Sequence, residues 1–365
     1  KEHWISVAKM YFQNPDKVQS NNIDTRTYVM RTGDIAFEGH PNKEFKFGRF
    51  VANDIGTGVV SELFPIYRHK QEYDNYYWKN AIQIERVMGP IFAKSITSSG
   101  NSSNKLDPNH FLRQQVFIPK LEEQKKIGLF LKKLDDTITL HQRKLDQLKE
   151  LKKAYLKAML ISMNTKNNKV PKLRFADFEG EWDQRKFKAF SKKTGKKNSQ
   201  NLNYPAYSVS NKSGLISQSE QFNGNRLDTL EKHSYKIVEP YEFAYNPARI
   251  NVGSIAFNTL GKPVIVSSLY VVLQMEDNLN NDFILQFIKS PAFVREVKRN
   301  TEGSVREYLF YENFANIKFP YTKNIKEQQK IGAFFKKSDD TIALRQNKLN
   351  QLKALKKAYL QNMFI

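Results

Sequence analysis

Paired carboxylates occur twice in this sequence, as Asp135-Asp136 and as Asp339-Asp340, and such pairs can serve acid–base or metal chemistry. Both pairs lie in stretches with helical periodicity, where adjacent residues point about 100° apart. They therefore do not converge on one reacting group, and lysines flank each of them. We interpret both pairs as a solvated or partner-facing edge of a helix.

Motifs of DNA-modifying enzymes are incomplete in this chain. Asn246-Pro247-Ala248-Arg249 lacks the second proline and the aromatic residue of an adenine methyltransferase site, so it favours a turn. Pro15-Asp16 with Glu44-Phe45-Lys46 imitates a nuclease set only superficially, because such short matches are common by chance. The six histidines show no pair at metal-ligand spacing. The sequence predicts neither a cofactor nor a metal site of its own.

Basic residues interleaved with aromatic and amide residues are the strongest candidates for binding. Arginine can recognise guanine with two hydrogen bonds, asparagine can do the same with adenine, and lysines hold phosphates. We expect Lys192, Lys193, Lys196 and Lys197 to contact phosphates. The other candidates are Lys43, Lys46, Arg49, Asn246, Arg249, Asn251, Lys262, Arg295, Arg299 and Arg306. For each of them, the alternative is an exposed polar group that contacts nothing.

The overall charge agrees with an anionic partner. Lysine and arginine number 59 against 37 aspartates and glutamates, which gives a formal net charge of +22. Such an excess favours a polyanion such as nucleic acid, although a merely basic protein would also show it. The chain has no cysteine, no apolar run near the roughly 20 residues of a membrane span, and no signal peptide. We expect a globular, cytoplasmic protein that does not bind membranes.

An internal repeat organises the chain. Residues 123–161 and 327–365 align with 27 of their 39 positions identical. Apolar residues recur every three or four positions in both copies, from Ile127 to Met159 and from Ile331 to Met363. The pattern predicts two long helices, each about 60 Å long at 1.5 Å per residue. At Lys152 and Lys356 the apolar stripe is expected to shift to Leu151 and Leu355.

Gly128 and Gly332 lie inside these predicted helices, where glycine costs about 1 kcal/mol relative to alanine. Either nothing compensates that cost or another backbone approaches closely at both positions. We favour the second alternative, with a partner subunit docking there.

Two faintly related mixed α/β modules accompany the helices, so the predicted class is α/β (α+β). Strand-like runs include 28–31, 34–37, 47–51 and 59–67 in the first module and 243–245, 253–257 and 264–273 in the second. Single helices are expected at 78–88 and 283–297. The expected boundaries are 1–119 for the first module, 120–161 for the first helical region, 162–171 for a linker, 172–320 for the second module and 321–365 for the second helical region.

Connectivity predicts an antiparallel helix pair with a pseudo-twofold axis and a module at each end. The repeat spans 204 positions, but the first copy has no counterpart of residues 170–202. We therefore expect about 40 further residues ahead of Lys1 in the natural chain.

The repeated pattern EQxKIG…LDDTI…QxKLxQLKxLKKAYLxxM, with Ser338 as one lapse, resembles the specificity subunit of type I restriction-modification systems. The segment VPKLRFADFEGEW is similar to that family as well. The resemblance implies two target-recognition domains that read the two halves of a bipartite, asymmetric double-stranded DNA target. It also implies that the helices set the spacing and dock two methyltransferase subunits, with motor-nuclease subunits joining them. Candidate docking residues are Gly128, Asp135, Asp136, Gly332, Asp339 and Asp340.

The same resemblance implies a chain without catalysis of its own. S-adenosylmethionine, ATP and Mg²⁺ would belong to the partner subunits, whose complex would methylate adenine at N6 and cleave DNA with ATP. Two alternatives remain open. One is a stand-alone enzyme that modifies or cleaves DNA, and the other is a coiled-coil scaffold that binds no nucleic acid.

Overall fold

The computed structural model describes residues 3–14, 16, 27–97, 103–160, 169–211, 213–218, 232–301 and 308–364. The chain forms two compact units. Unit 1 is Lys1–Lys144 with Arg345–Ile365, and unit 2 is Leu145–Leu344. Each unit thus combines one module with half of each long helix, whereas the expected domain boundaries follow the ends of the elements. We call the described residues 3–119 module 1 and the described residues 169–321 module 2.

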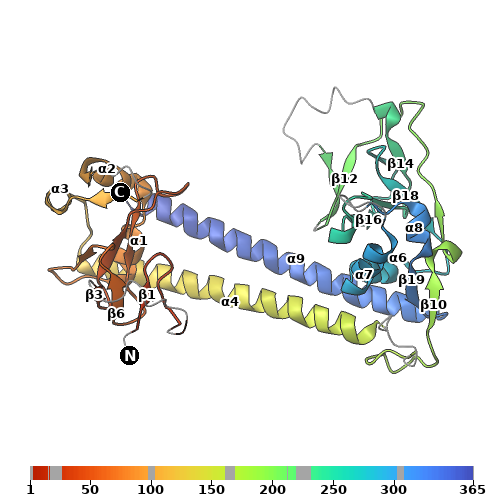
Figure 1. Cartoon of the computed structure of the whole chain (residues 1–365), viewed down its shortest axis with the longest axis horizontal. Coiled ribbons are helices and arrows are strands. Elements are labelled where there is room, and N and C mark those ends of the chain that lie inside the picture. Colours follow the sequence, from red (N-terminus) through yellow and green to blue (C-terminus); the bar gives the residue numbers. More distant parts are fainter. Residues whose placement is uncertain are drawn as a thin grey trace. The chain divides into compact units, whose positions relative to one another are not determined.

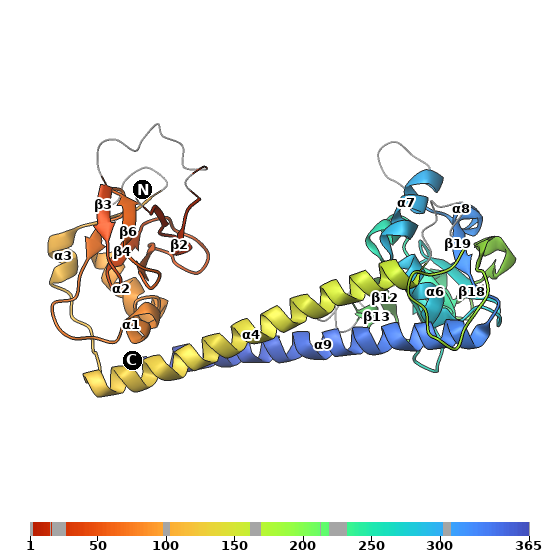
Figure 2. The same ribbon diagram turned by 90° about the horizontal axis from the view of Figure 1, so that it is seen from below.

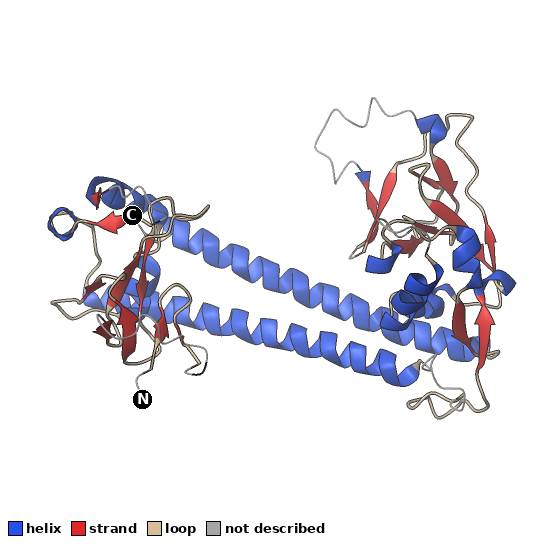
Figure 3. Ribbon diagram, viewed as in Figure 1, coloured by secondary structure: helices blue, strands red, loops and turns tan. Residues whose placement is uncertain are grey.

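Module 1 is a set of small antiparallel sheets covered by short helices (Figure 3). Its central sheet has the order β5-β4-β7, formed by Arg49–Ala52, Ile35–Glu38 and Ile66–Tyr67. Paired with each other are β1 (Ile5–Ser6) and β2 (Tyr11–Phe12), β3 (Thr27–Met30) and β6 (Gly58–Ser61), and β8 (Ile96–Thr97) and β9 (Lys105–Leu106). The helices are α1 (Asn75–Ala81), α2 (Glu85–Ser95) and α3 (Pro108–Leu112).

Module 2 has a larger central sheet of order β11-β18-β15-β16, formed by Ser191–Lys193, Val271–Met275, Phe243–Tyr245 and Ile255–Phe257. The paired strands are β10 (Asp183–Lys186) and β19 (Lys318–Tyr321), β12 (Tyr207–Ser210) and β13 (Gly214–Ser217), and β14 (Lys236–Val238) and β17 (Val264–Val266). Its α-helices are α6 (Asn281–Ile288), α7 (Pro291–Asn300) and α8 (Tyr311–Asn316) (Figure 1). Three 3-10 helices complete it: η3 (Phe187–Ala189), η4 (Lys232–Ser234) and η5 (Ile250–Val252). Aromatic side chains, including Trp182, Phe187 and Phe283, fill its core.

Several predicted elements are shorter in the structure than the sequence indicated. The run 59–67 is not one strand, because a turn at 62–65 separates β6 from β7. The predicted helix 283–297 is two helices, since Ser290 caps α7 by accepting a hydrogen bond from Phe293 N at 3.3 Å and Pro291 begins it. Similarly, 78–88 covers the end of α1 and the start of α2.

The two modules share one topology, which confirms their predicted relationship. The order β5-β4-β7 in module 1 corresponds to β16-β15-β18 in module 2, and the pair β3/β6 corresponds to β14/β17. Helix α1 follows β7 as α6 follows β18, and an acidic or amide side chain caps each helix. The predicted fold class, mixed α/β modules with long paired helices, is confirmed.

The long helices are α4 (Leu121–Met159) and α9 (Ile325–Asn362). In unit 1, Phe130 of α4 packs edge-on against Tyr359 of α9, and in unit 2 Tyr155 of α4 packs against Phe334. Residues early in α4 therefore meet residues late in α9 and the reverse, so the segments pair antiparallel within each unit.

The predicted side-step of the apolar stripe is wrong. Leu151 and Leu355 are 49% and 45% exposed. The stripe instead continues through Lys152 and Lys356, which are half-buried because each of them pairs with an aspartate of the other helix.

Candidate nucleic-acid interface

In unit 1, Gly128 marks the place where module 1 rests on α4. A Cβ atom at Gly128 would lie 2.0 Å from Asp74 Oδ1 and 3.1 Å from Tyr77 N. Asp74 is the N-cap of α1 and accepts a hydrogen bond from Tyr77 N at 2.7 Å. Gln124, one turn earlier on α4, accepts a hydrogen bond from Asp74 N at 3.2 Å. The N-terminus of α1 therefore packs on α4 at Gly128. Figure 2 shows α1 beside the first turns of α4.

Unit 2 repeats this contact with different residues. A Cβ atom at Gly332 would lie 2.7 Å from Asn280 Oδ1 and 2.8 Å from Phe283 N. Asn280 caps α6, and its backbone N–H donates to Gln328 Oε1 at 2.8 Å. The close backbone approach that the glycines indicated is present, but the chain's own module makes it. We correct the docking assignment of Gly128 and Gly332 accordingly, since both are buried under a helix N-terminus.

Asp135 and Asp339 cross-link the long helices within the two units. Lys356 Nζ lies 2.6 Å from Asp135 Oδ1, and Lys152 Nζ lies 2.5 Å from Asp339 Oδ1. Each aspartate also contacts its module. Tyr76 donates its hydroxyl to Asp135 at 2.7 Å, and Gln286 Nε2 lies 3.5 Å from Asp339. Burial, reinforced by the hydrogen bond to Asp135, raises the pKa of Tyr76. The second aspartates, Asp136 and Asp340, are exposed.

The candidate loop of module 1, residues 39–48, connects β4 to β5 at the end of the sheet where Glu38 pairs with Arg49. We call this end the loop end of module 1. Lys43 and Lys46 are exposed there. Arg49 is more constrained, because its guanidinium donates to Ala8 O at 2.6 Å and lies 5.1 Å from the Phe45 ring centroid.

The candidate loop of module 2, residues 246–254, connects β15 to β16 in the same topological position. It leaves the sheet where Tyr245 pairs with Ile255 and Val271, and we call this the loop end of module 2. Arg249 is exposed. Asn246 uses its side-chain oxygen to accept a hydrogen bond from Ala248 N at 3.0 Å, while Asn251 is half-buried in η5. Arg249 is therefore more accessible to a ligand than Asn246 or Asn251.

Further predicted cations gather at the loop end of module 2. The chain runs from β11 towards Val271, because Lys193 pairs with Leu273 and Thr194 N donates to Val272 O at 2.9 Å. This direction brings Lys196 and Lys197 to the loop end. Lys192 and Lys193 lie farther back along β11, opposite Gln274 and Leu273, and Lys193 Nζ pairs with Glu312 Oε1 at 3.2 Å. Arg295 and Arg299 are exposed on α7, which packs against η5.

Two predicted residues are not part of this group. Lys262 lies at the opposite end of the sheet, where its carbonyl accepts a hydrogen bond from Asn258 Nδ2 at 2.9 Å beside the Phe243–Phe257 pair. The structure therefore does not place it beside Arg249. Arg306 lies outside the described residues.

Lys236 is a cation at the loop end of module 2 that the sequence analysis missed. Its ammonium group donates to Tyr270 O at 2.6 Å, and Lys236 and Lys197 form an isolated β-bridge. Burial and the nearby charges of Lys193 and Lys197 lower the pKa of Lys236. The sequence does not indicate this role of Lys236, which is the first residue of a short strand. Only strand pairing brings it close to the other lysines.

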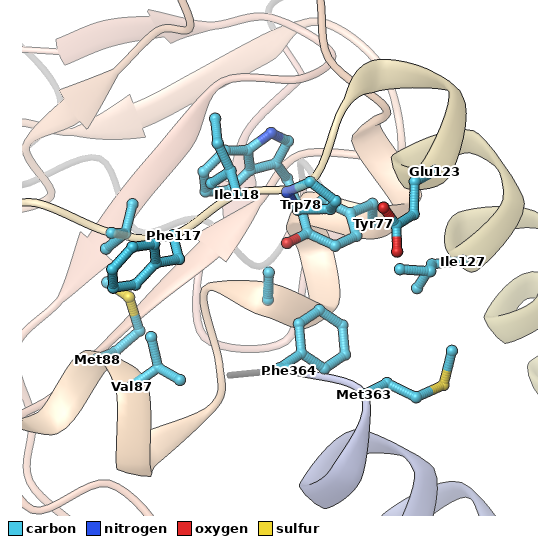
Figure 4. Close-up of a pocket in the computed structure, with 13 residues that line it drawn as sticks. Tyr77, Trp78, Val87, Met88, Phe117, Ile118, Glu123, Ile127, Met363 and Phe364 are labelled. Carbon is cyan, nitrogen blue, oxygen red and sulfur yellow. The ribbon is translucent and has the colours of Figure 1, made fainter.

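Glu123 and Glu327 hold equivalent positions in the first turns of α4 and α9 but have different surroundings. Glu327 is fully buried and takes two hydrogen bonds from Arg174, at 2.6 and 2.9 Å. Glu123 lines a cavity of about 290 Å³ in unit 1, beside Tyr77, Ile118 and Phe364 (Figure 4). None of the described cations pairs with Glu123.

The described part of the chain contains no group of three or more histidine and acidic side chains placed to hold a metal ion. In the same residues, no helix is both long and apolar enough to cross a membrane.

Comparison with known proteins fits this architecture. Residues 60–150 and 181–354 match the family model described as the type I restriction modification DNA specificity domain. The fold resembles the S subunit of a type I restriction-modification system from M. genitalium, with a TM-score of 0.56 and 13% identity over 93% of this chain and 84% of that one. It also resembles a chain from a structural study of complex assembly and conformational transition in the type I system, with a TM-score of 0.51 and 13% identity over 99% and 90% of the two chains.

The family match covers more than half of the sequence. The chain therefore belongs to the family of type I restriction-modification DNA specificity proteins.

Proposed function

We propose that modules 1 and 2 of this chain, expected as residues 1–119 and 172–320, each read one half of a bipartite, asymmetric double-stranded DNA target. One observation carries the proposal: both modules have the same topology and hold a cation-bearing loop at the same end of the central sheet. These loops differ in sequence, HPNKEFKFGR in one module and NPARIN in the other. Different side chains at equivalent positions would select different bases, so the two half-sites would differ.

Exposed cations at each loop end support contact with the DNA backbone and with base edges. Lys43 and Lys46 in module 1 and Lys196, Lys197 and Arg249 in module 2 would supply this charge. A protein that neutralises phosphates releases counterions, so its affinity falls steeply with salt. Arg249 is the leading candidate for a base contact, because it is exposed at the middle of its loop.

The assembled complex would provide the chemistry. Two methyltransferase subunits, with their S-adenosylmethionine, would dock on the helical regions, and motor-nuclease subunits would supply ATP-driven cleavage with Mg²⁺. Exposed Asp136 and Asp340 are the acidic positions left for such docking, since Asp135 and Asp339 have partners within the chain. Replacing Asp136 and Asp340 together by lysine should lower the amount of methyltransferase subunit that co-purifies with the chain.

Methylome mapping of a host that carries the complete complex tests the proposal directly. The expected result is one split target with two different half-sites, methylated on adenine. Arg249→Ala should then weaken binding of the complex by about 1–3 kcal/mol and relax preference in one half-site only. Lys153→Ala on the outer face of α4 removes the same charge and is the matched control. A complex that binds all sequences equally would contradict the proposal.

A further inference from the structure

Leu63 and Leu269 occupy the same position in the two modules and are strongly exposed, at 79% and 77%. Leu63 lies in the turn between β6 and β7, and Leu269 lies in the turn between β17 and β18. Exposed single leucines are common on protein surfaces and need no explanation by themselves. Here, however, an exposed leucine occurs at the same structural position in both modules, although the loops beside it differ in sequence. The exposed leucine is therefore a feature of both copies of the fold.

The two turns are built in the same way. Leu63 N donates to Ser61 Oγ at 3.3 Å, and Leu269 N donates to Ser267 Oγ at 3.4 Å. In addition, Phe64 N donates to Ser61 O at 3.1 Å, and Tyr270 N donates to Ser267 O at 3.0 Å. These are serine turns, in which the hydroxyl replaces a backbone acceptor.

An aromatic residue after each leucine anchors the turn. Phe64 packs against the core that contains Val60, and Tyr270 packs against the core that contains Val266. Lys236 also binds the carbonyl of Tyr270 at 2.6 Å. Because the aromatic side chain points inwards and the serine fixes the backbone, each leucine is presented outwards on a defined turn.

Both turns lie at the loop ends of their modules. In module 1, Ala36 pairs with Ile66 and Phe37 N donates to Pro65 O at 2.9 Å, so the turn at Leu63 lies beyond Glu38. In module 2, Tyr245 pairs with Val271, so the turn at Leu269 lies beside the loop that carries Arg249. Each leucine therefore shares its sheet end with the candidate DNA-contacting loop.

We propose that Leu63 and Leu269 insert into a groove of the DNA and contact the bases of the half-site that their own module reads. This inference rests on the proposed DNA-reading function. Two cations lie at the Leu269 turn: Lys236, whose ammonium group donates to Tyr270 O at 2.6 Å, and Lys197, which forms a β-bridge with Lys236. They favour DNA as the occupant over an apolar protein surface, since they would face phosphates beside the groove. Aliphatic side chains contact bases either at the thymine methyl group or as wedges between base pairs.

The test uses the full chain in complex with its methyltransferase subunits and the mapped target. Leu269→Ala should lower affinity for that target about tenfold, the effect of withdrawing one leucine side chain from a buried contact. Affinity for random DNA and the salt dependence should stay unchanged, because no charge is removed. Leu63→Ala should act in the same way on the other half-site. Leu344→Ala is the matched control, because Leu344 is 70% exposed and belongs to α9 and not to either module, and it should leave binding unchanged.

Two DNA probes separate the modes of contact. Replacing thymine by uracil in the half-site should remove the difference between wild type and Leu269→Ala if the leucine contacts a methyl group. A 2-aminopurine reporter should brighten with wild type but not with the variant if the leucine acts as a wedge. Either result supports the inference.

Other outcomes would overturn it. If Arg249→Ala weakens binding while both leucine variants bind like wild type, the leucines do not contact DNA and the proposed function still stands. If the leucine variants lose methyltransferase subunits but keep DNA affinity, the occupant is protein. Failure of the wild-type complex to bind DNA would reject the proposed function itself.

Discussion

Units 1 and 2 place two copies of one helical repeat against different surroundings, and the comparison shows what residues 174–193 contribute to unit 2. In unit 2, residues 174–193 supply Arg174 to Glu327, β10 to β19 and β11 to β18. In unit 1, Glu123 has no paired cation among the described residues, Phe117 is exposed, and β7 pairs with β4 alone among the described strands. One contiguous segment thus gives unit 2 a buried ion pair and two additional strands.

The largest expected effect is on the buried ion pair. Glu327→Ala leaves Arg174 largely buried without its carboxylate, which should destabilise unit 2 by about 3–5 kcal/mol. Glu123→Ala should change the stability of unit 1 by less than about 0.5 kcal/mol, because no described partner is lost. Hydrogen exchange of amides in β15 and β4 reports the two units separately. Equal losses of stability from the two substitutions would contradict the proposed difference between Glu327 and Glu123.

The second comparison concerns the helix glycines. Gly332→Ala places a Cβ atom 2.8 Å from the backbone N of Phe283, so α6 itself must move. Overpacking costs about 1–3 kcal/mol, and the gain in helix propensity returns about 1 kcal/mol. A net destabilisation of unit 2 by up to about 2 kcal/mol is expected. Denaturant-induced unfolding, monitored by hydrogen exchange of amides in β15, measures it.

Gly128→Ala is the matched variant in unit 1 and should cost less. Its close neighbour is the Asp74 carboxylate, which can rotate away at the loss of a cap worth about 1 kcal/mol, while the nearest backbone atom is 3.1 Å away. A larger loss of stability for Gly128→Ala than for Gly332→Ala would show that the Asp74 side chain cannot rotate away.

A smaller difference is expected between the two cross-helix aspartates. Asp135→Ala removes an ion pair and the acceptor for Tyr76. Asp339→Ala removes an ion pair whose carboxylate is more exposed, and a long contact to Gln286. Exposed pairs contribute about 0–1 kcal/mol, so Asp135→Ala should cost about 1 kcal/mol and Asp339→Ala a few tenths. Chemical denaturation of each variant measures the difference, and reversal of the order would contradict it.

The smallest expected effect is on the pH dependence of the stability of unit 1, and it involves Asp34. Burial acts to raise the pKa of Asp34, but hydrogen bonds from Arg68 and from Arg31 N outweigh it, so the pKa lies below its ordinary value. A lowered pKa in the folded state adds stability above the unfolded-state value of about 3.9, and this is lost as pH falls further. Unit 1 should therefore lose stability below about pH 4. Asp34→Asn should flatten that dependence in a pH series of thermal unfolding.

The sequence alone determined the elements whose signal is periodic or repeated. Heptad-like spacing over nearly forty residues specified both long helices, because burying one face requires that spacing whatever the modules do. The repeat also implied that the modules are related, and charge with aromatic interleaving pointed to the loops around Lys43 and Arg249. These loops are equivalent in the fold.

Only the tertiary structure decided which residues of different elements contact each other. Gly128 and Gly332 indicated a close approach, but a glycine cannot specify which backbone uses it, and the approaching groups are the N-termini of α1 and α6. Strand pairing placed Lys236 beside Lys197 and moved Lys262 to the opposite sheet end. Antiparallel packing likewise brought Lys152 to Asp339, because the pairing of residues far apart in sequence depends on which surfaces meet.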